Sequence, residues 1–227
     1  MGEALGRAIQ LIFSADREVF GISATSLVLA LLSTVLAGVL GILVAVLLRI
    51  RDFPGRRAIL VILNAFMALP TVVIGLTIYG LLSRSGPFGP LGLLFTRRAI
   101  VIGQTVLALP IVTSLAYTAL AGAGDTVQET LTSLGITGFR RWLIVIDEAR
   151  SAIIIAMVTG FGRVVGEVGV SMMLGGNIRW HTRTITTAIV LETGKGEFEQ
   201  ALALGLILVT ISLGVNAILR AGIRDER

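Results

Sequence analysis

The chain has 227 residues, of which 55% are hydrophobic, and it carries a net charge of +5 with a mean hydropathy of +0.92. It has no cysteine and one histidine, His181, which excludes disulfides, thiolate metal sites and a histidine metal cluster. All but one of the 19 basic residues are arginines that flank apolar runs, a pattern typical of membrane topology signals and not of nucleic-acid binding.

Long runs without charge indicate the membrane spans. Four stretches of 20 to 30 residues contain no Asp, Glu, Lys or Arg, and about 20 apolar residues suffice to cross a bilayer as a helix. A fifth apolar stretch has Arg163 and Glu167 as its only charged residues. We therefore predict an all-α integral membrane protein in a lipid bilayer, with one transmembrane domain over residues 1–227. The five expected spans cover approximately residues 21–48, 58–83, 99–122, 151–176 and 200–219.

The second and third spans each contain an Ala-Leu-Pro triplet, which ends at Pro70 in one and at Pro110 in the other. Proline removes one helical hydrogen bond and kinks the helix, and neighbouring helices can cover the gap. We expect a kink at each proline. The two kinks are either matched parts of a gate or ordinary bends.

A short polar segment separates the third and fourth spans. An Asp-x-x-Gln capping box at 125–128 begins an expected helix over residues 125–135. Val127, Leu131 and Leu134 form one apolar stripe on it, and Gly135 ends it. The helix either docks a partner or lies on the bilayer as a linker.

Loop charges indicate the orientation. The first loop has four arginines within residues 49–57, and short loops with such clusters stay in the cytoplasm. We therefore expect a multi-pass protein of the cell membrane with its N-terminus outside and its C-terminus cytoplasmic. The helix at 125–135 is then cytoplasmic as well.

This helix and the following span resemble a known family. The stretch Glu129-Thr-Leu-Thr-Ser-Leu-Gly135 resembles the Glu-Ala-Ala-x-x-x-Gly signature of permease subunits of ABC importers, although Asp147 and Glu148 stand where the family usually has Leu-Pro. Gly160-Phe-Gly-Arg163, Gly166-Glu-Val-Gly169 and the residues 172–178 are similar to permeases of the tungstate importer group.

The resemblance implies a type I ABC importer permease that works as a homodimer. Two ATP-binding subunits would dock on the cytoplasmic side, and a solute-binding protein would deliver an oxyanion from outside. The cargo would be tungstate, with molybdate or sulfate as the alternative. The ATPase-coupling residues implied by the signature are Glu129, Leu131, Leu134 and Gly135.

No enzymatic activity is expected of the chain alone. Gly194-Lys195-Gly196 lacks the spacing and the hydroxyl of a phosphate-binding loop, so ATP and Mg²⁺ would be bound by the partner ATPase and no cofactor by this chain. One membrane carboxylate leaves no credible catalytic group. The competing reading of another class is a membrane scaffold or receptor that does not transport.

Arg163 and Glu167 are four residues apart, and therefore share a helix face in the fourth span. Charges in a span are costly and face a bundle interior or a wet cavity. Three interpretations stay open: an ion pair at a dimer interface, an Arg163 that meets the passing anion, and a Glu167 that binds a partner helix or adjusts the gate. Pro70 and Pro110 are the other gate candidates.

The last outer loop is basic and aromatic. Arg179, Trp180 and Arg183 are expected either to dock the solute-binding protein and steer the anion, or to anchor the chain at the membrane interface. Just before them, Gly175 and Gly176 either expose backbone N–H groups to an anion or simply stop a helix. The charged residues of 192–199 are expected in a solvated loop.

Overall fold

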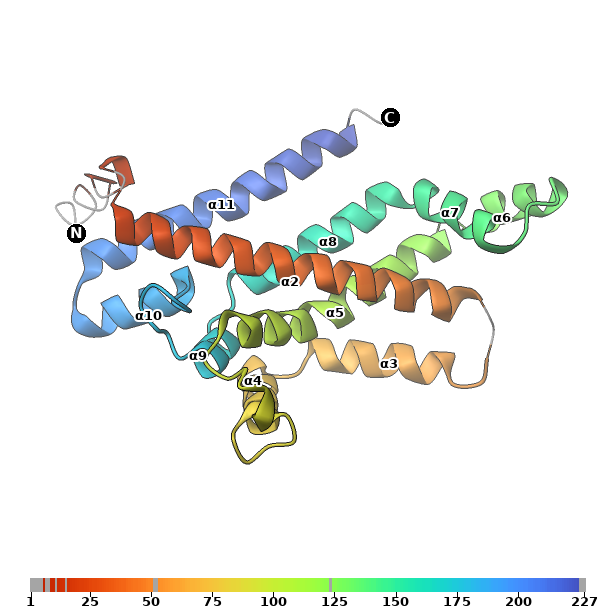
Figure 1. Ribbon diagram of the computed structural model, residues 1–227. Helices are drawn as coiled ribbons and strands as arrows, with labels where there is room; N and C mark the ends of the chain where they lie inside the picture. The colour runs from red at the N-terminus through yellow and green to blue at the C-terminus, as the bar shows by residue number, and fades with distance from the viewer. Residues whose placement is uncertain are drawn as a thin grey trace.

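The computed structural model of the chain describes residues 6, 9–10, 12–14, 16–50, 53–122 and 124–224, and it describes their side chains except at 124–126, 128, 129, 139 and 218–224. Three long apolar helices lie lengthwise in it: α2 (Arg17–Ile50), α5 (Arg97–Gly122) and α11 (Phe198–Arg224) (Figure 1). They cover the first, third and fifth expected spans. Two pairs of shorter helices are each bent at a break, so the described residues hold three to five spans.

The centre of the fold is the contact between α2 and α5, and small residues make it possible. A Cβ atom on Gly41 of α2 would lie 3.0 Å from the Thr113 hydroxyl of α5, and one on Gly38 would overlap Met157 of α8, which packs on α2 as well. The buried hydroxyls of Ser33 and Thr34 donate to carbonyls one turn earlier in α2, at 2.7 Å each. Small and hydroxyl residues of this kind let membrane helices approach closely.

The second expected span is two helices instead of one kinked helix. α3 (Arg56–Met67) and α4 (Thr71–Leu82) meet at 102°, and Pro70 is the N-cap of α4. The residue before a proline avoids helical geometry, so the chain breaks there. Pro110, by contrast, is buried inside the uninterrupted α5. The two prolines therefore differ: Pro70 stands at a break between two helices, whereas Pro110 lies inside one continuous helix.

The fourth expected span is also broken. α8 (Arg150–Val165) ends at Gly166, and α9 (Gly169–Gly175) continues at 62° to it. α9 lies between α4 and α5, since Cβ atoms on Gly75 of α4 and Gly103 of α5 would both press against Val170 of α9. Gly176 then stops α9 in a left-handed conformation with φ +68°.

The residues after α9 differ most from the sequence-based expectation. α10 (Ile185–Lys195) is a helix with a capping box formed by Thr184 and Thr187. Glu192 lies in it with only 4% of its surface exposed, so its expected place in a solvated loop is wrong. The ion pairs that Glu192 makes there, described below, compensate its burial.

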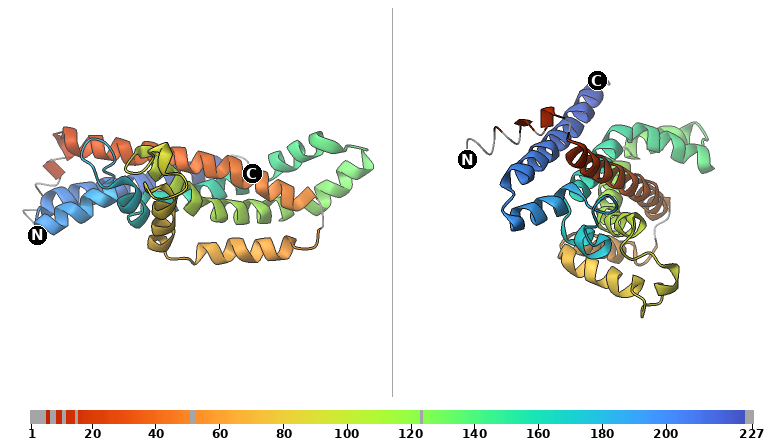
Figure 2. Two further views of the ribbon diagram at one scale, coloured as in Figure 1. Left: turned by 60° about the horizontal axis from the view of Figure 1, so that its bottom comes forward. Right: turned by 60° about the vertical axis from the view of Figure 1, so that its left-hand side comes forward.

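The short helices α6 (Gly124–Ser133) and α7 (Gly138–Glu148) project at one end of the molecule, while the start of α2 and α10 lie at the opposite end (Figures 1 and 2). A single 3₁₀ turn, η1 (Gly89–Leu91), connects α4 to α5. The functional residues expected from the sequence therefore fall into three places: the α6–α7 segment, the α8–α9 break and the opposite end.

Candidate functional site

The α6–α7 segment (residues 124–148) turns at Gly135, as the sequence predicts. Gly135 has φ +67°, the Ile136 N–H donates to the Leu131 carbonyl at 2.9 Å, and the Gly135 N–H donates to the Thr132 carbonyl at 3.1 Å. These two bonds form the Schellman motif that ends helices at a left-handed residue. A side chain at position 135 would strain the motif.

The expected apolar stripe of α6 divides in two. Leu131 is 4% exposed and packs with Val145 and Ala149, and Val127 packs at the edge of the same cluster. Leu134 is 67% exposed, because it follows the last helical residue and the turn directs it elsewhere. Glu129 lies in α6, but its side chain is outside the described residues. The segment thus leaves Leu134 on the surface and uses Leu131 for its own packing.

α7 continues almost directly into α8. Ala149 is the C-cap of α7 and the N-cap of α8, and it is 4% exposed. Its N–H donates to the Val145 carbonyl at 3.1 Å, and its carbonyl accepts from the Ile153 N–H at 2.9 Å. Ala149 thus joins the α6–α7 segment to α8 without an intervening loop.

Arg163 and Glu167 form an ion pair at the far end of α8. Arg163 Nη1 lies 2.8 Å from Glu167 Oε2, while the other carboxylate oxygen accepts from the Val170 N–H at 3.1 Å. The Glu167 side chain is 4% exposed and that of Arg163 is 36% exposed. Glu167 thereby compensates the charge of Arg163 and caps the start of α9. Arg163 remains partly open to the surface.

Buried polar side chains from four helices satisfy the rest of the α8–α9 break. The Gln104 amide nitrogen donates to the Val164 carbonyl and to Ser171, at 3.4 Å each, and its oxygen accepts from Ser33 at 2.9 Å. The Thr186 hydroxyl donates to the Glu167 carbonyl at 2.8 Å. Inside a membrane each backbone group needs such a partner, so this network allows a span to be interrupted.

The two broken spans meet at this point. A Cβ atom on Gly169 of α9 would lie 3.2 Å from Val72 and 3.3 Å from Thr71 at the start of α4. Pro70 therefore stands near the Glu167 end of the break, while Pro110 lies within α5 and takes no part in a break. Of the two predicted gate prolines, the structure brings one to the charged residues.

The basic and aromatic residues of the α9–α10 loop lie together at the other end of the molecule. Arg179 grips the carboxylate of Glu18 with two nitrogens, at 2.8 and 2.5 Å, and Arg183 Nη1 lies 3.3 Å from the same carboxylate. The hydrogen bond and the charge of Glu18 raise the pKa of Arg179 above its ordinary value. The guanidinium of Arg179 also stands 5.5 Å from the centre of the Trp180 ring. His181 is a loop residue, as expected, and its carbonyl accepts from Arg97.

Sequence reasoning missed three residues of these sites. Glu18 reaches Arg179 over 161 positions, and Glu192 contacts both Arg183, at 3.9 Å, and Lys195, at 3.1 Å. Gln104 was an ordinary polar residue in an apolar run. Its amide in the middle of a charge-free span was the one available signal, because a buried amide in a membrane requires partners.

The described residues thus form a helical membrane domain with a charged interruption in one span and an exposed helical segment at one end, the architecture of a transporter's membrane subunit. The chain matches no protein-family model. It is 40% identical to the tungstate uptake system permease protein TupB of Campylobacter jejuni, over 93% of this chain and 89% of that protein. It is 38% identical to a probable anion ABC transporter permease protein of Haloferax volcanii, over 90% of both chains.

A solved structure of the inward-facing MetNI methionine ABC transporter contains a chain with the same fold. It superposes with a TM-score of 0.74 at 18% identity, over 95% of this chain and 97% of that one. The chain belongs to the family of ABC transporter permeases, in the branch that includes the TupB proteins. It is a membrane-spanning permease subunit and not the ATPase of such a system.

Proposed function

We propose that the chain forms the membrane path of an ATP-driven importer for a tetrahedral oxyanion, and that the cargo is tungstate. The observation that carries the proposal is the similarity to a tungstate uptake permease along about nine-tenths of both chains. The charges of the described spans are consistent with it, since Arg163 stands at the α8–α9 break and its ion-pair partner Glu167 is the more deeply buried of the two.

The working unit is a homodimer with one ATP-binding subunit on each copy. Leu134 is an exposed leucine at the tip of the α6–α7 segment, and a docking ATPase would bury it together with Glu129. ATP binding draws the two ATPases together, and α7 transmits the movement to α8 through Ala149. Leu131 packs α6 against α7, and Gly135 allows the left-handed turn between them.

The same arrangement supports an orientation with the N-terminus outside and the C-terminus in the cytoplasm. The α6–α7 segment lies at one end, and the loop with Arg179, Trp180 and Arg183 lies at the other (Figure 1). A solute-binding protein would therefore dock on that loop from outside. A molybdate or sulfate cargo would use the same machine, because nothing in this arrangement of charges is specific for the central atom of the anion.

Uptake into proteoliposomes tests the cargo. The permease, its ATPase and its binding protein are reconstituted together, and tungstate, molybdate and sulfate compete for ATP-dependent uptake. Uptake dominated by tungstate supports the proposal. Uptake of molybdate or sulfate instead would confirm an oxyanion importer with a different cargo. Absence of all uptake by the assembled complex would contradict the importer function and favour a membrane scaffold.

The docking surface is tested by Leu134→Asp. This leucine is 67% exposed, so a charge there leaves the permease folded but disrupts an apolar contact with the ATPase. We expect ATPase binding and uptake to fall at least about tenfold, the size of one buried anchor residue. The control is Leu91→Asp, a change at a leucine that is 63% exposed on η1. Equal ATPase binding by both variants would place the docking surface elsewhere.

The role of Arg163 is tested by Arg163→Gln. Glutamine still donates a hydrogen bond to Glu167 but removes the positive charge that would lower the barrier for a passing anion. We expect slower uptake by a complex that still assembles, although the permease is less stable because the buried Glu167 carboxylate loses its cation. Thr159→Ala, a change at an exposed residue one turn away on α8, is the matched control. An unchanged rate of uptake by Arg163→Gln would remove Arg163 from the path.

A further inference from the structure

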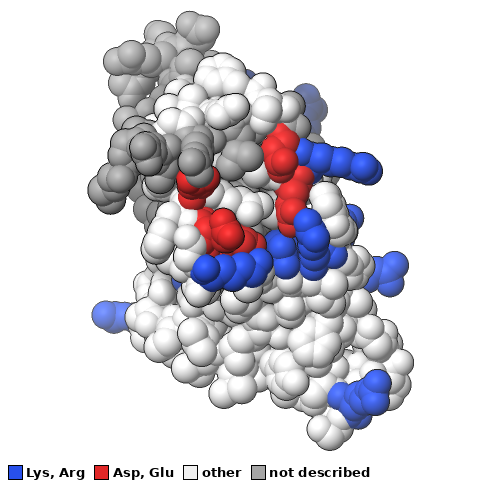
Figure 3. All heavy atoms as spheres, turned by 90° about the vertical axis from the view of Figure 1, so that its left-hand side faces the viewer, with Lys and Arg blue, Asp and Glu red and all other residues white. Residues whose placement is uncertain are grey.

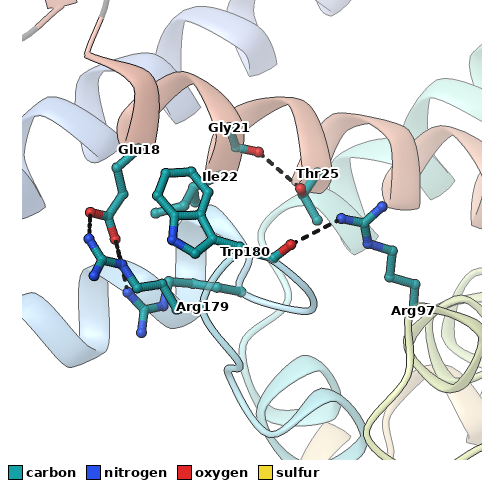
Figure 4. Close-up of a pocket in the computed structure, with 8 residues that line it drawn as sticks. Glu18, Gly21, Ile22, Thr25, Arg97, Arg179 and Trp180 are labelled. Atoms are coloured by element: carbon teal, nitrogen blue, oxygen red, sulfur yellow. Dashed lines mark hydrogen bonds and ion pairs between the residues drawn. The ribbon is translucent and has the colours of Figure 1, made fainter.

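A pocket of about 180 Å³ opens at the end of the molecule opposite the α6–α7 segment. Its walls come from the start of α2, the start of α5 and the α9–α10 loop (Figure 4). Seen from this end, basic and acidic side chains gather in a belt across the surface (Figure 3). The pocket therefore joins three parts of the chain that are far apart in sequence.

The pocket has an excess of positive charge. Three arginines line it, Arg97, Arg179 and Arg183, and Glu18 is the one carboxylate among its lining residues. Glu192 stands 3.9 Å from Arg183, but Lys195 contacts both oxygens of Glu192 at 3.1 Å. The lysine thus balances Glu192, and two of the three arginine charges remain uncompensated in the pocket.

Glu18 shows which chemistry the pocket accepts. Its two oxygens accept hydrogen bonds from the guanidinium of Arg179, and one of them also accepts from Arg183 at 3.3 Å. Paired N–H donors of arginine fit the oxygens of a carboxylate and of a tetrahedral oxyanion in the same way. The Glu18 side chain is only 19% exposed, so it already occupies the place that a small anion would take.

Further features indicate a site that can change its ligand. The Arg183 side chain is 10% exposed, and its Nε is buried with no hydrogen-bond partner among the described residues. Trp180 has φ +63°, which is uncommon for a bulky residue and costs energy. Arg97 holds this turn by donating to the carbonyls of His181, at 2.6 Å, and Trp180, at 3.5 Å. The strained backbone at Trp180 and the unused Nε donor of Arg183 both lie beside the Glu18 carboxylate, so we infer that another anion can replace this carboxylate.

We propose that this pocket is an extracytoplasmic binding site for a tetrahedral oxyanion, and that the anion binds by displacing Glu18 from Arg179 and Arg183. The proposal rests on the oxyanion importer function. The site receives the anion as the binding protein releases it and holds it weakly, since a conduit that binds tightly cannot pass its cargo on. Glu18 closes the site again when the anion moves on.

Trp180 provides a direct readout of binding. The chain has two tryptophans, Trp142 and Trp180, so Trp142→Phe leaves one per permease chain, in the pocket wall, and the same complex with Trp180→Phe as well gives the background of the other proteins. The permease–ATPase complex in nanodiscs, without binding protein or ATP, is titrated with sodium tungstate up to about 10 mM, which covers millimolar dissociation constants. Sodium chloride at equal ionic strength corrects for screening. We expect a saturable change in Trp180 fluorescence with sodium tungstate and no saturable change with sodium chloride.

Two variants with opposite expected effects on tungstate affinity give the decisive result. Glu18→Gln removes the competing carboxylate and should tighten tungstate binding at least about threefold, whereas Arg183→Gln should weaken it at least about tenfold. Arg183→Lys keeps the charge and should recover part of the loss. Arg98→Gln, at an exposed neighbour that does not line the pocket, should change nothing. Thermal unfolding of each variant verifies that it is folded.

Two results would overturn the proposal. One is a titration without saturation; the other is a Glu18→Gln variant that weakens tungstate binding as much as Arg183→Gln does, since Glu18 would then only support the fold. Binding of the solute-binding protein is measured on the same variants. A loss there, with no effect of tungstate, would assign the arginines to docking. If uptake persists in proteoliposomes while these tests fail, the pocket is refuted and the importer function stands.

Discussion

The two broken spans solve the same problem by different means. At the α3–α4 break the interruption comes from the covalent structure of Pro70, and α3 has no buried residue. At the α8–α9 break there is no proline; the Glu167 carboxylate, the Gln104 amide and the Thr186 hydroxyl bond to the freed backbone groups. The first break is a property of the chain, and the second is a property of the tertiary structure. The hydrogen bonds at the second break can open and re-form, whereas the proline ring at the first is fixed.

The largest effect is expected at Glu167. Glu167→Leu leaves Arg163 unpaired and α9 uncapped, which should cost about 3 kcal/mol in unfolding free energy, at the low end for a broken buried pair because Arg163 is partly exposed. Unfolding of the purified permease in detergent measures it. The double variant Arg163→Met/Glu167→Leu should regain a large part of the loss, because no charge is left unpaired. If the double variant is as unstable as the single one, the ion pair is not what holds the break.

Gln104 is expected to come next. Gln104→Leu keeps the volume but leaves the Val164 carbonyl, Ser33 and Ser171 without this partner, which should cost about 1 to 3 kcal/mol. The same unfolding measurement applies, with Thr118→Val on the exposed side of α5 as the control. Equal stability of Gln104→Leu and the wild type would mean that the amide is dispensable and that the break is held by Glu167 alone.

The smallest effect is expected at the other break. Pro70→Ala should change the unfolding free energy by less than about 1 kcal/mol, because alanine can adopt the φ of −60° found there and α4 stays packed on α9. Pro110→Ala in the continuous α5 provides the comparison. A loss at Pro70 as large as that at Glu167 would remove the distinction between a covalent and a tertiary break.

The sequence predicts well whatever depends on local pattern. Charge-free runs indicate α2, α5 and α11, the left-handed stop at Gly135 follows from its residue type, and a spacing of four residues predicts the contact between Arg163 and Glu167. Each of these depends on residues within about one or two helical turns.

Contacts between distant residues could not be predicted in this way. Glu192 is in an acidic stretch that looks solvated, and its burial is compensated by Lys195 in its own helix and by Arg183 from the preceding loop. The ion pair of Arg179 with Glu18 joins residues 161 positions apart, and the break between α8 and α9 depends on side chains from other helices. The local sequence pattern around each of these residues does not indicate its distant partner.

Because Ala149 ends α7 and begins α8, a tilt of α7 about this residue would also tilt α8. Arg163 stands about 20 Å along α8 from Ala149, at 1.5 Å per residue. A tilt of only about 5° at the α6–α7 end would therefore move the guanidinium by about 2 Å, close to the length of a hydrogen bond. Under the proposed function, a movement of the ATPase docked on the α6–α7 segment would reach the span as a displacement sufficient to make or break the Arg163–Glu167 ion pair.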